Sequence, residues 1–181
     1  MSRATTAMAA DLAIGLVSGL VATKVTGFAQ EALYRPMPES IKEQEERVRP
    51  GPPAKVAAEK TAERLGVRLE GRRLETAASI VHYGLGAIWG PVYGLLRRHS
   101  GMSAPGAGFV TGASMSLIVD EALTPAFGFS APNRDYPPIT HLRGFLGHLV
   151  YGTMVALTAE ALYRLLDLAR SEDSKRAPRG A

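Results

Sequence analysis

The segment from Ala77 to Leu96 has no charged residue and ends at the basic pair Arg97 and Arg98. Because an α-helix rises 1.5 Å per residue, about 20 residues span a hydrocarbon core of about 30 Å. The segment therefore predicts a transmembrane helix. Within it Gly86, Gly90 and Gly94 recur every fourth residue, which gives a ridge without side chains that a second helix can approach closely.

Three further apolar segments cover residues 9–33, 106–127 and 144–166. The mean hydropathy of the chain is only +0.01, because a charged segment (residues 35–75) and a polar tail (residues 170–181) offset the apolar ones. The pattern predicts a single, all-α membrane domain with four transmembrane helices. A partly helical charged loop would join the first two helices, and the tail would be disordered.

The 181 residues carry a net charge of +4 and no cysteine. The arginines flank apolar segments and have no interleaved aromatic residues, so they favour a lipid bilayer over nucleic acid as the partner. We predict no cofactor and no metal. The chain has no GxSxG, P-loop, HExxH or dinucleotide fingerprint, so we predict no enzymatic activity and no catalytic residue.

Small residues at four-residue spacing also occur in the first and third segments, as Gly15 with Gly19 and Gly108 with Gly112. The sequence Gly15-Leu-Val-Ser-Gly19 is similar to Gly108-Phe-Val-Thr-Gly112, and a His–Tyr–Gly pattern at His82 is echoed at His148. These similarities predict two helical hairpins in the same orientation, a weak parallel repeat.

Ionisable residues lie at nearly one depth when the four helices are placed in alternating directions. The first helix contributes Lys24, the second His82 and the fourth His148, and the third contributes Asp120 and Glu121. A lone charge at the bilayer centre costs at least ~2.5–3.5 kcal/mol on insertion scales, so these groups should face inward and pair. We predict an intramembrane polar layer formed by Lys24, His82, Asp120, Glu121 and His148.

Three interpretations of this layer are open. In the first it is structural: Lys24 neutralises Asp120 or Glu121, and the histidines hydrogen-bond across helices. In the second it moves protons or small ions, because imidazole and carboxylate groups can change protonation near neutral pH. In the third, His82 and His148 hold a haem or a metal ion. We favour small-ion or proton-linked transport as the activity, with a structural or partner-binding membrane subunit as the alternative.

In the charged segment, residues 54–65 have helical i, i+4 charge pairs but few apolar positions. This pattern favours a solvated connection over an arm that binds lipid or a partner. Proline at position 91 predicts a kink in the second membrane helix.

The segments GLVSGLVATKVTGFAQEALYRPMP, VHYGLGAIWGPVYGLL, GFVTGASMSLIVDEALTPAFGF and FLGHLVYG occur in this order. Together they resemble the YagU-like family of uncharacterised bacterial inner-membrane proteins. The resemblance implies a multi-pass protein of the cytoplasmic membrane with both termini cytoplasmic, and it implies no established activity. In that family the third span carries histidine where this chain has Asp120 and Glu121. The expected partners are lipid, a second copy of the chain or another membrane protein.

Overall fold

The computed structural model describes residues 3–176, and this part of the chain consists of helices joined by short connections. Three helices are long: α1 (Arg3–Tyr34), α4 (Gly71–His99) and α7 (Pro138–Arg176). The predicted all-helical class is confirmed. The remaining helical elements are α2 (Glu39–Val48), α3 (Pro53–Arg64), α5 (Ala104–Met115), the π-helical η1 (Ser116–Leu123), α6 (Thr124–Ala126) and the 3₁₀ turn η2 (Asn133–Asp135).

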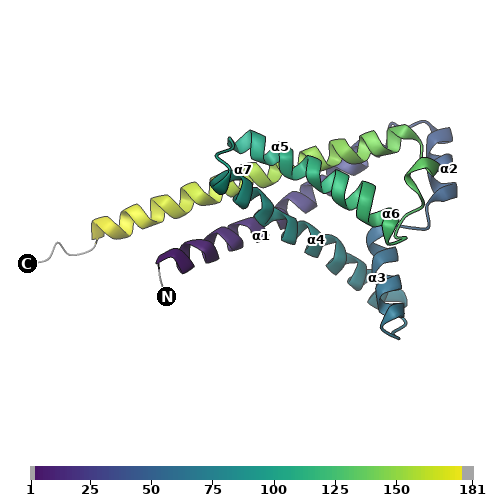
Figure 1. The fold of residues 1–181 in the computed structure, drawn as a ribbon, viewed down its shortest axis with the longest axis horizontal. Helices are drawn as coiled ribbons and strands as arrows, with labels where there is room; N and C mark the ends of the chain where they lie inside the picture. Colours follow the sequence, from purple (N-terminus) through teal and green to yellow (C-terminus); the bar gives the residue numbers. More distant parts are fainter. Residues whose placement is uncertain (1–2, 177–181) are drawn as a thin grey trace, which may run out of the picture.

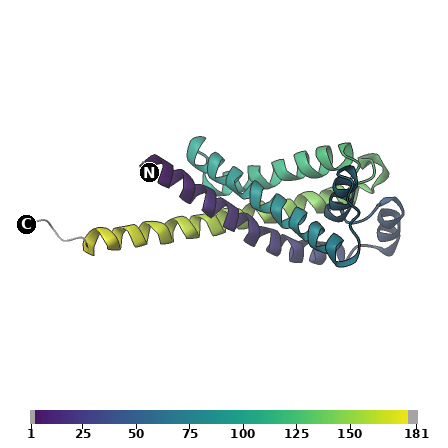
Figure 2. The same cartoon turned by 90° about the horizontal axis from the view of Figure 1, so that it is seen from below.

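Elements α5, η1 and α6 follow one another without a break, and we call residues 104–126 the composite helix. With α1, α4 and α7 it forms an elongated bundle (Figures 1 and 2). The two termini lie at one end of this bundle, the terminal end, whereas α2, α3 and α6 lie at the other, the loop end (Figure 1). α1 packs on α4 and α7, and α5 packs on α7.

Backbone-to-backbone contact joins α1 to α4. Gly19 faces the carbonyl of Gly86, and Gly90 faces the carbonyl of Gly15. A Cβ atom added to Gly15 would lie 2.7 Å from Cα of Pro91, closer than real Cβ atoms approach backbone. The predicted small-residue ridge is therefore the place where these helices meet, and Pro91 lies inside an α4 that continues to His99.

The same kind of contact joins α5 to α7. A Cβ atom on Gly108 would lie 2.8 Å from the carbonyl oxygen of Gly152, and Gly112 faces the carbonyl of His148. The third glycine of the α4 ridge differs, because a Cβ on Gly94 would stand at an ordinary 3.5 Å from the hydroxyl of Tyr163. Gly94 thus takes no part in the backbone contact with α1.

The first hairpin consists of α1 and α4, and the second consists of the composite helix and α7. The two hairpins run in the same direction and have similar glycine contacts. Gly19 faces Gly86 in the first hairpin, and its counterpart Gly112 faces His148 in the second. Packing therefore equates Gly86 with His148, whereas the sequence similarity equates His82 with His148. The second helices of the two hairpins are offset by one helical turn from the register that the sequence comparison predicts.

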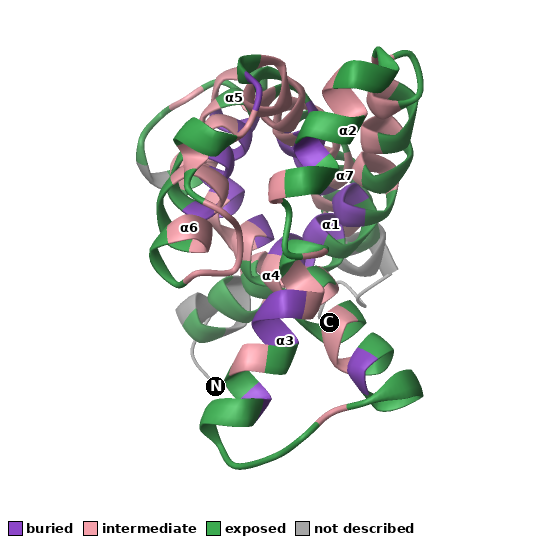
Figure 3. Cartoon of the chain, turned by 90° about the vertical axis from the view of Figure 1, so that its right-hand side faces the viewer, coloured by how far each residue is buried: buried purple, intermediate pink, exposed green. Residues whose placement is uncertain are grey.

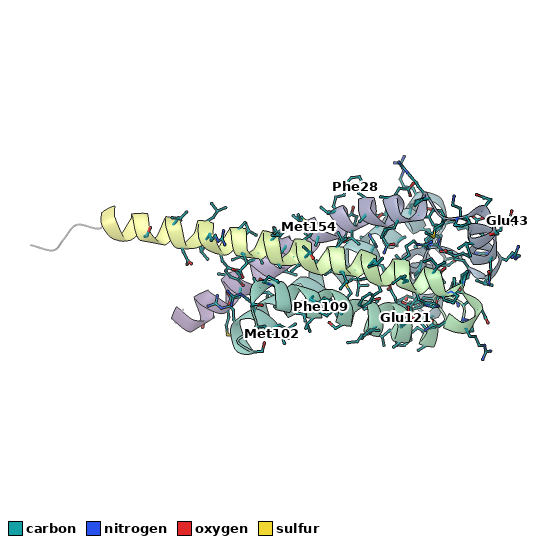
Figure 4. The ribbon with its side chains drawn as sticks, turned by 90° about the horizontal axis from the view of Figure 1, so that it is seen from above. Phe28, Glu43, Met102, Phe109, Glu121 and Met154 are labelled. Carbon is teal, nitrogen blue, oxygen red and sulfur yellow. The ribbon has the colours of Figure 1, made fainter. Side chains whose placement is uncertain are left out.

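Many of the side chains buried between the helices are small, although Tyr93 and Tyr151 are buried as well, and many large apolar side chains are exposed. Small and hydroxyl side chains are buried between the helices, as at Ser18, Ala22, Ala107, Thr111 and Ser116 (Figure 3). Large apolar side chains on all four long helical stretches instead point outward, and Figure 4 shows Phe28 and Phe109 on the outer sides of α1 and α5. Water-soluble monomers rarely expose apolar surface on this scale.

By length and composition, two helices can cross a membrane, over Met8–Tyr34 and Pro138–Ala169. The predicted spans 9–33 and 144–166 lie within them. The predicted spans 77–96 and 106–127 do not meet the same criterion of helix length and mean hydropathy. α4 is long enough, but its glycine, tyrosine, proline and histidine residues lower its mean hydropathy, and η1 divides the composite helix into shorter elements.

The charged segment 35–75 is partly helical, as predicted, and most of its residues are exposed, but one of its helices packs on the bundle. It folds into α2 and α3, and the predicted helix 54–65 corresponds to α3. α3 packs against α4 and buries Val56, Ala57, Ala58 and Ala62. The sequence prediction undervalued this face because three of the four residues are alanines, whose small side chains allow close helix contact without a large apolar stripe.

The predicted disordered tail begins inside a helix, because α7 continues to Arg176. The residues that follow Leu168 include no glycine or proline before Pro178, so no residue type that ends a helix interrupts α7 there. Residues 177–181 lie outside the described part of the chain.

Candidate functional site

The centre of the predicted layer is a contact between the composite helix and α7. Nδ1 of His148 lies 3.3 Å from Oδ2 of Asp120 and 3.0 Å from the backbone oxygen of Gly144. Both of these atoms are acceptors when Asp120 is ionised, so the geometry favours a proton on Nδ1. The side chain of His148 is only 12% exposed, which leaves Asp120 as its close polar partner beside the α7 backbone.

His82 of α4 is exposed, and its ring meets that of Tyr83 edge-on at a centroid distance of 5.3 Å. The structure thus brings two of the five predicted residues, Asp120 and His148, into direct contact.

Glu121 belongs to a neighbouring cluster at the loop end. Its carboxylate lies 2.8 Å from Nδ1 of His141 and accepts a hydrogen bond of 2.9 Å from Nδ2 of Asn133. Nε2 of His141 lies 3.0 Å from the backbone oxygen of Asn133. Both ring nitrogens of His141 therefore face acceptor atoms, an arrangement that the doubly protonated imidazolium satisfies completely.

The π-helical element η1 explains how adjacent carboxylates reach different partners. Asp120 and Glu121 are consecutive, yet they contact His148 and His141, which lie two helical turns apart on α7. π-helical turns are rare and are often found at functional sites. Figure 4 places Glu121 toward the loop end of the composite helix.

Lys24 is not part of this site. Its side chain is exposed, and its ammonium group lies over the ring of Phe28, one turn further along α1, at 5.2 Å. Among the described residues, no hydrogen bond or ion pair involves Lys24. His148 and Asp120, predicted at equal depth, are in contact, but depth does not specify which side of a helix a residue occupies.

The terminal end has a second polar network, which sequence reasoning missed. Glu160 accepts hydrogen bonds from the hydroxyl of Tyr93 at 2.8 Å and from Nε of Arg97 at 3.0 Å. Arg98 pairs with Asp11 at 2.6 Å. Comparing depths, as was done for the central layer, would have indicated these pairs, because Arg97 and Arg98 end one span while Asp11 begins another.

Between the central cluster and this terminal network the bundle is closed by packing. The hydroxyl of Tyr151 donates to the backbone oxygen of Gly86 at 2.6 Å, and the indole of Trp89 donates to that of Thr111 at 3.1 Å. Tyr151 is almost completely buried. We call this closed region, where the glycines of both hairpins also meet, the waist.

Comparison of the chain with protein-family models, with curated proteins and with solved structures finds no match. Within residues 3–176, no three His, Asp or Glu side chains are grouped as metal ligands would be.

Proposed function

We propose that the chain is a multi-pass membrane protein in which α4 and the composite helix cross the bilayer together with α1 and α7. Support comes from the outward side chains of the two less hydrophobic helices. Ile80, Ile88 and Leu95 of α4 are 67%, 70% and 60% exposed. On the composite helix, Phe109 and Leu117 point outward as well. Lipid would cover these surfaces, which water would otherwise contact.

The proposed location is the cytoplasmic membrane, with both termini on the cytoplasmic side. The basic pair Arg97 and Arg98 lies toward the terminal end, as expected for a cytoplasmic flank. The resemblance to the YagU-like family supports the same location, and membership of that family stays a prediction.

We further propose that the protein moves protons through its loop-end half. The observation that carries this proposal is the contact of Asp120 with His148, beside the contact of Glu121 with His141. Because Asp120 and Glu121 are adjacent, the two contacts form one series of protonatable groups. Imidazole gains and loses protons near neutral pH, and ionisable groups at membrane depth commonly mark proton pathways.

The series has an accessible end and a closed end. The side chains of His141, Glu121 and Asp120 are 31%, 29% and 40% exposed, whereas His148 is 12% exposed and the waist closes the inner side with Tyr151 and the facing glycines. Protons would therefore enter at His141, Glu121 or Asp120 and pass to His148. Release toward the terminal end would require the waist to open, and the fold supplies Tyr93 and Glu160 beyond it.

Proton flux into liposomes that contain the purified full-length protein tests this proposal. We expect flux with the wild type and its loss in His148→Gln and Asp120→Asn, which keep the approximate side-chain volume. Lys24→Gln is the matched control and should conduct like the wild type, because Lys24 lies outside the cluster. Equal flux in all four proteins, or none in a folded and inserted wild type, would contradict the proposal.

A structural subunit is the second candidate function, favoured by the shape of α7. This helix extends beyond the composite helix and α4 at the terminal end, and Leu168 on the extension is 62% exposed (Figure 1). A partner helix docking on the extension would cover it. Absence of flux together with a stoichiometric membrane partner that dissociates in Leu168→Glu would favour this function.

A further inference from the structure

An open cavity of about 560 Å³, lined by both charged and apolar residues, lies between α1, α4 and α7 near the terminal end. This volume is within the range of small-ligand sites, about 300–1,000 Å³. The charged groups in its lining have both signs: the guanidinium groups of Arg97 and Arg98, and the carboxylates of Asp11, Glu160 and Asp167. The proton pathway described above does not use the cavity as a binding site.

The two arginines are fixed by their partners but retain donors. Arg98 pairs with Asp11 through Nη1, and its guanidinium lies 5.6 Å from the ring centre of Tyr163. Arg97 contacts Glu160 through Nε and the backbone oxygen of Met102 through Nη1. A guanidinium has five N–H donors, so each arginine can also bind an anionic group such as a phosphate.

Carboxylates in the same lining would disfavour a purely anionic ligand. Three carboxylates face two guanidinium groups, and an added anion would lie close to the carboxylates. A ligand with both a phosphate and an ammonium group matches the two signs, because its phosphate can bind an arginine while its ammonium lies beside a carboxylate.

Apolar side chains next to the cavity indicate that the ligand is amphiphilic. Ala10 of α1 and Tyr163 and Leu166 of α7 line the cavity beside the charged groups, and Leu165, adjacent to Leu166 in sequence, is 61% exposed. A soluble zwitterion would leave these side chains uncovered. Acyl chains that descend from a bound head group would cover them.

We infer that this cavity binds the head group of phosphatidylethanolamine from the surrounding membrane. The phosphate would lie at Arg97 and Arg98, and the primary ammonium would lie on the side of Asp11 and Asp167. The inference rests on the proposed membrane insertion and is independent of proton movement. The two arginines supply the kind of basic group that binds lipid head groups in pockets between membrane helices.

Native mass spectrometry of the full-length protein tests the inference with phosphatidylethanolamine, phosphatidylcholine and phosphatidylglycerol of identical acyl chains. We expect phosphatidylethanolamine to bind roughly tenfold more tightly than either, since a choline group has no N–H donor and a glycerol group has no positive charge. Equal binding of the three lipids, or preference for phosphatidylglycerol, would overturn the inference. Free phosphoethanolamine that binds as tightly as the lipid would also overturn it.

Variants locate the binding. Arg97→Gln and Arg98→Gln should each reduce the preference for phosphatidylethanolamine, because each removes a guanidinium group assigned to the phosphate. Arg35→Gln removes an exposed pair with Glu31 at the loop end and should leave the preference unchanged. A preference retained in folded Arg97→Gln and Arg98→Gln would overturn the assignment to this cavity.

The two proposals fail separately. A wild type that inserts into liposomes without conducting protons would refute the proton pathway and leave the lipid comparison valid. A wild type that remains soluble and does not insert would refute both.

Discussion

The carboxylate of Glu45 accepts two hydrogen bonds from Nη2 of Arg143, at 2.6 and 2.9 Å, although 98 residues separate the two in sequence. Their side chains are only 5% and 11% exposed. Thr140 donates a third hydrogen bond to the same carboxylate, and the guanidinium of Arg143 lies over the ring of Tyr34 at 4.8 Å. The pair therefore joins α2 of the charged segment to the start of α7 and the end of α1.

Glu45→Ala should strongly destabilise the folded protein. The substitution leaves the guanidinium of Arg143 buried without its carboxylate, and breaking one side of a buried pair costs about 3–5 kcal/mol. Unfolding in mild detergent measures the effect, and limited proteolysis should show cleavage within α2. Glu43→Ala is the control, because Figure 4 shows Glu43 pointing away from the bundle. Comparable losses in both variants would mean that the buried pair contributes nothing specific.

Gly15→Ala should destabilise the contact between α1 and α4, whereas Gly84→Ala should not. An added methyl at Gly15 meets the backbone of Pro91 at 2.7 Å, but a methyl at Gly84 meets no heavy atom within 4 Å. Overpacking a close contact costs about 1–3 kcal/mol, while alanine in a helix is favoured over glycine by about 0.5–1 kcal/mol. Thermal unfolding of the two variants should therefore shift in opposite directions. Shifts of the same sign would show that Gly15 does not mediate close packing.

Lys24→Ala should change the free energy of unfolding by no more than ~0.5 kcal/mol, the usual range for exposed positions. The residue is exposed and its described contact is with the ring of Phe28. Neutralising Asp120 or Glu121 should give no rescue, in contrast to the pairing that the sequence suggests. A double-mutant cycle of Lys24→Ala with Asp120→Asn measures the coupling, and an interaction larger than the experimental error would restore Lys24 to the polar layer.

The sequence predicted the helical class and the glycines that mediate contact because both depend on local patterns. Residue type at fixed spacing indicates which face of a helix is small, as at Gly15 and Gly108. The rotation of a helix about its own axis depends instead on all its neighbours. For this reason the sequence predicted an inward-facing Lys24, whereas the structure places this residue on the exposed side of α1.

Long-range pairs were the other part that the sequence could not specify. The sequence around Glu45 does not indicate that this residue is buried. Glu43 and Glu46 have similar sequence neighbours, and both are exposed. His141 precedes the predicted span 144–166, yet it lies in the first turn of α7 and faces Glu121. The π-helical element that directs Glu121 toward it has no recognised sequence signal.

Glu121 and His141 should be energetically coupled through Asn133. Glu121→Gln removes the charge that faces the imidazole, and His141→Gln removes the group that faces both Glu121 and the backbone oxygen of Asn133. Residues within one hydrogen-bond network show interaction energies of about 0.5–3 kcal/mol, so the double variant should lose less stability than the sum of the single variants. Unfolding of the four proteins in the same detergent gives this energy. His141→Gln combined with Glu31→Gln is the matched cycle, because Glu31 pairs with Arg35 on the exposed side of α1 and should contribute additively. Additive losses of stability in the first cycle would show that Glu121 and His141 are not coupled. The entrance that we propose for protons would then lack a fixed carboxylate–imidazole contact.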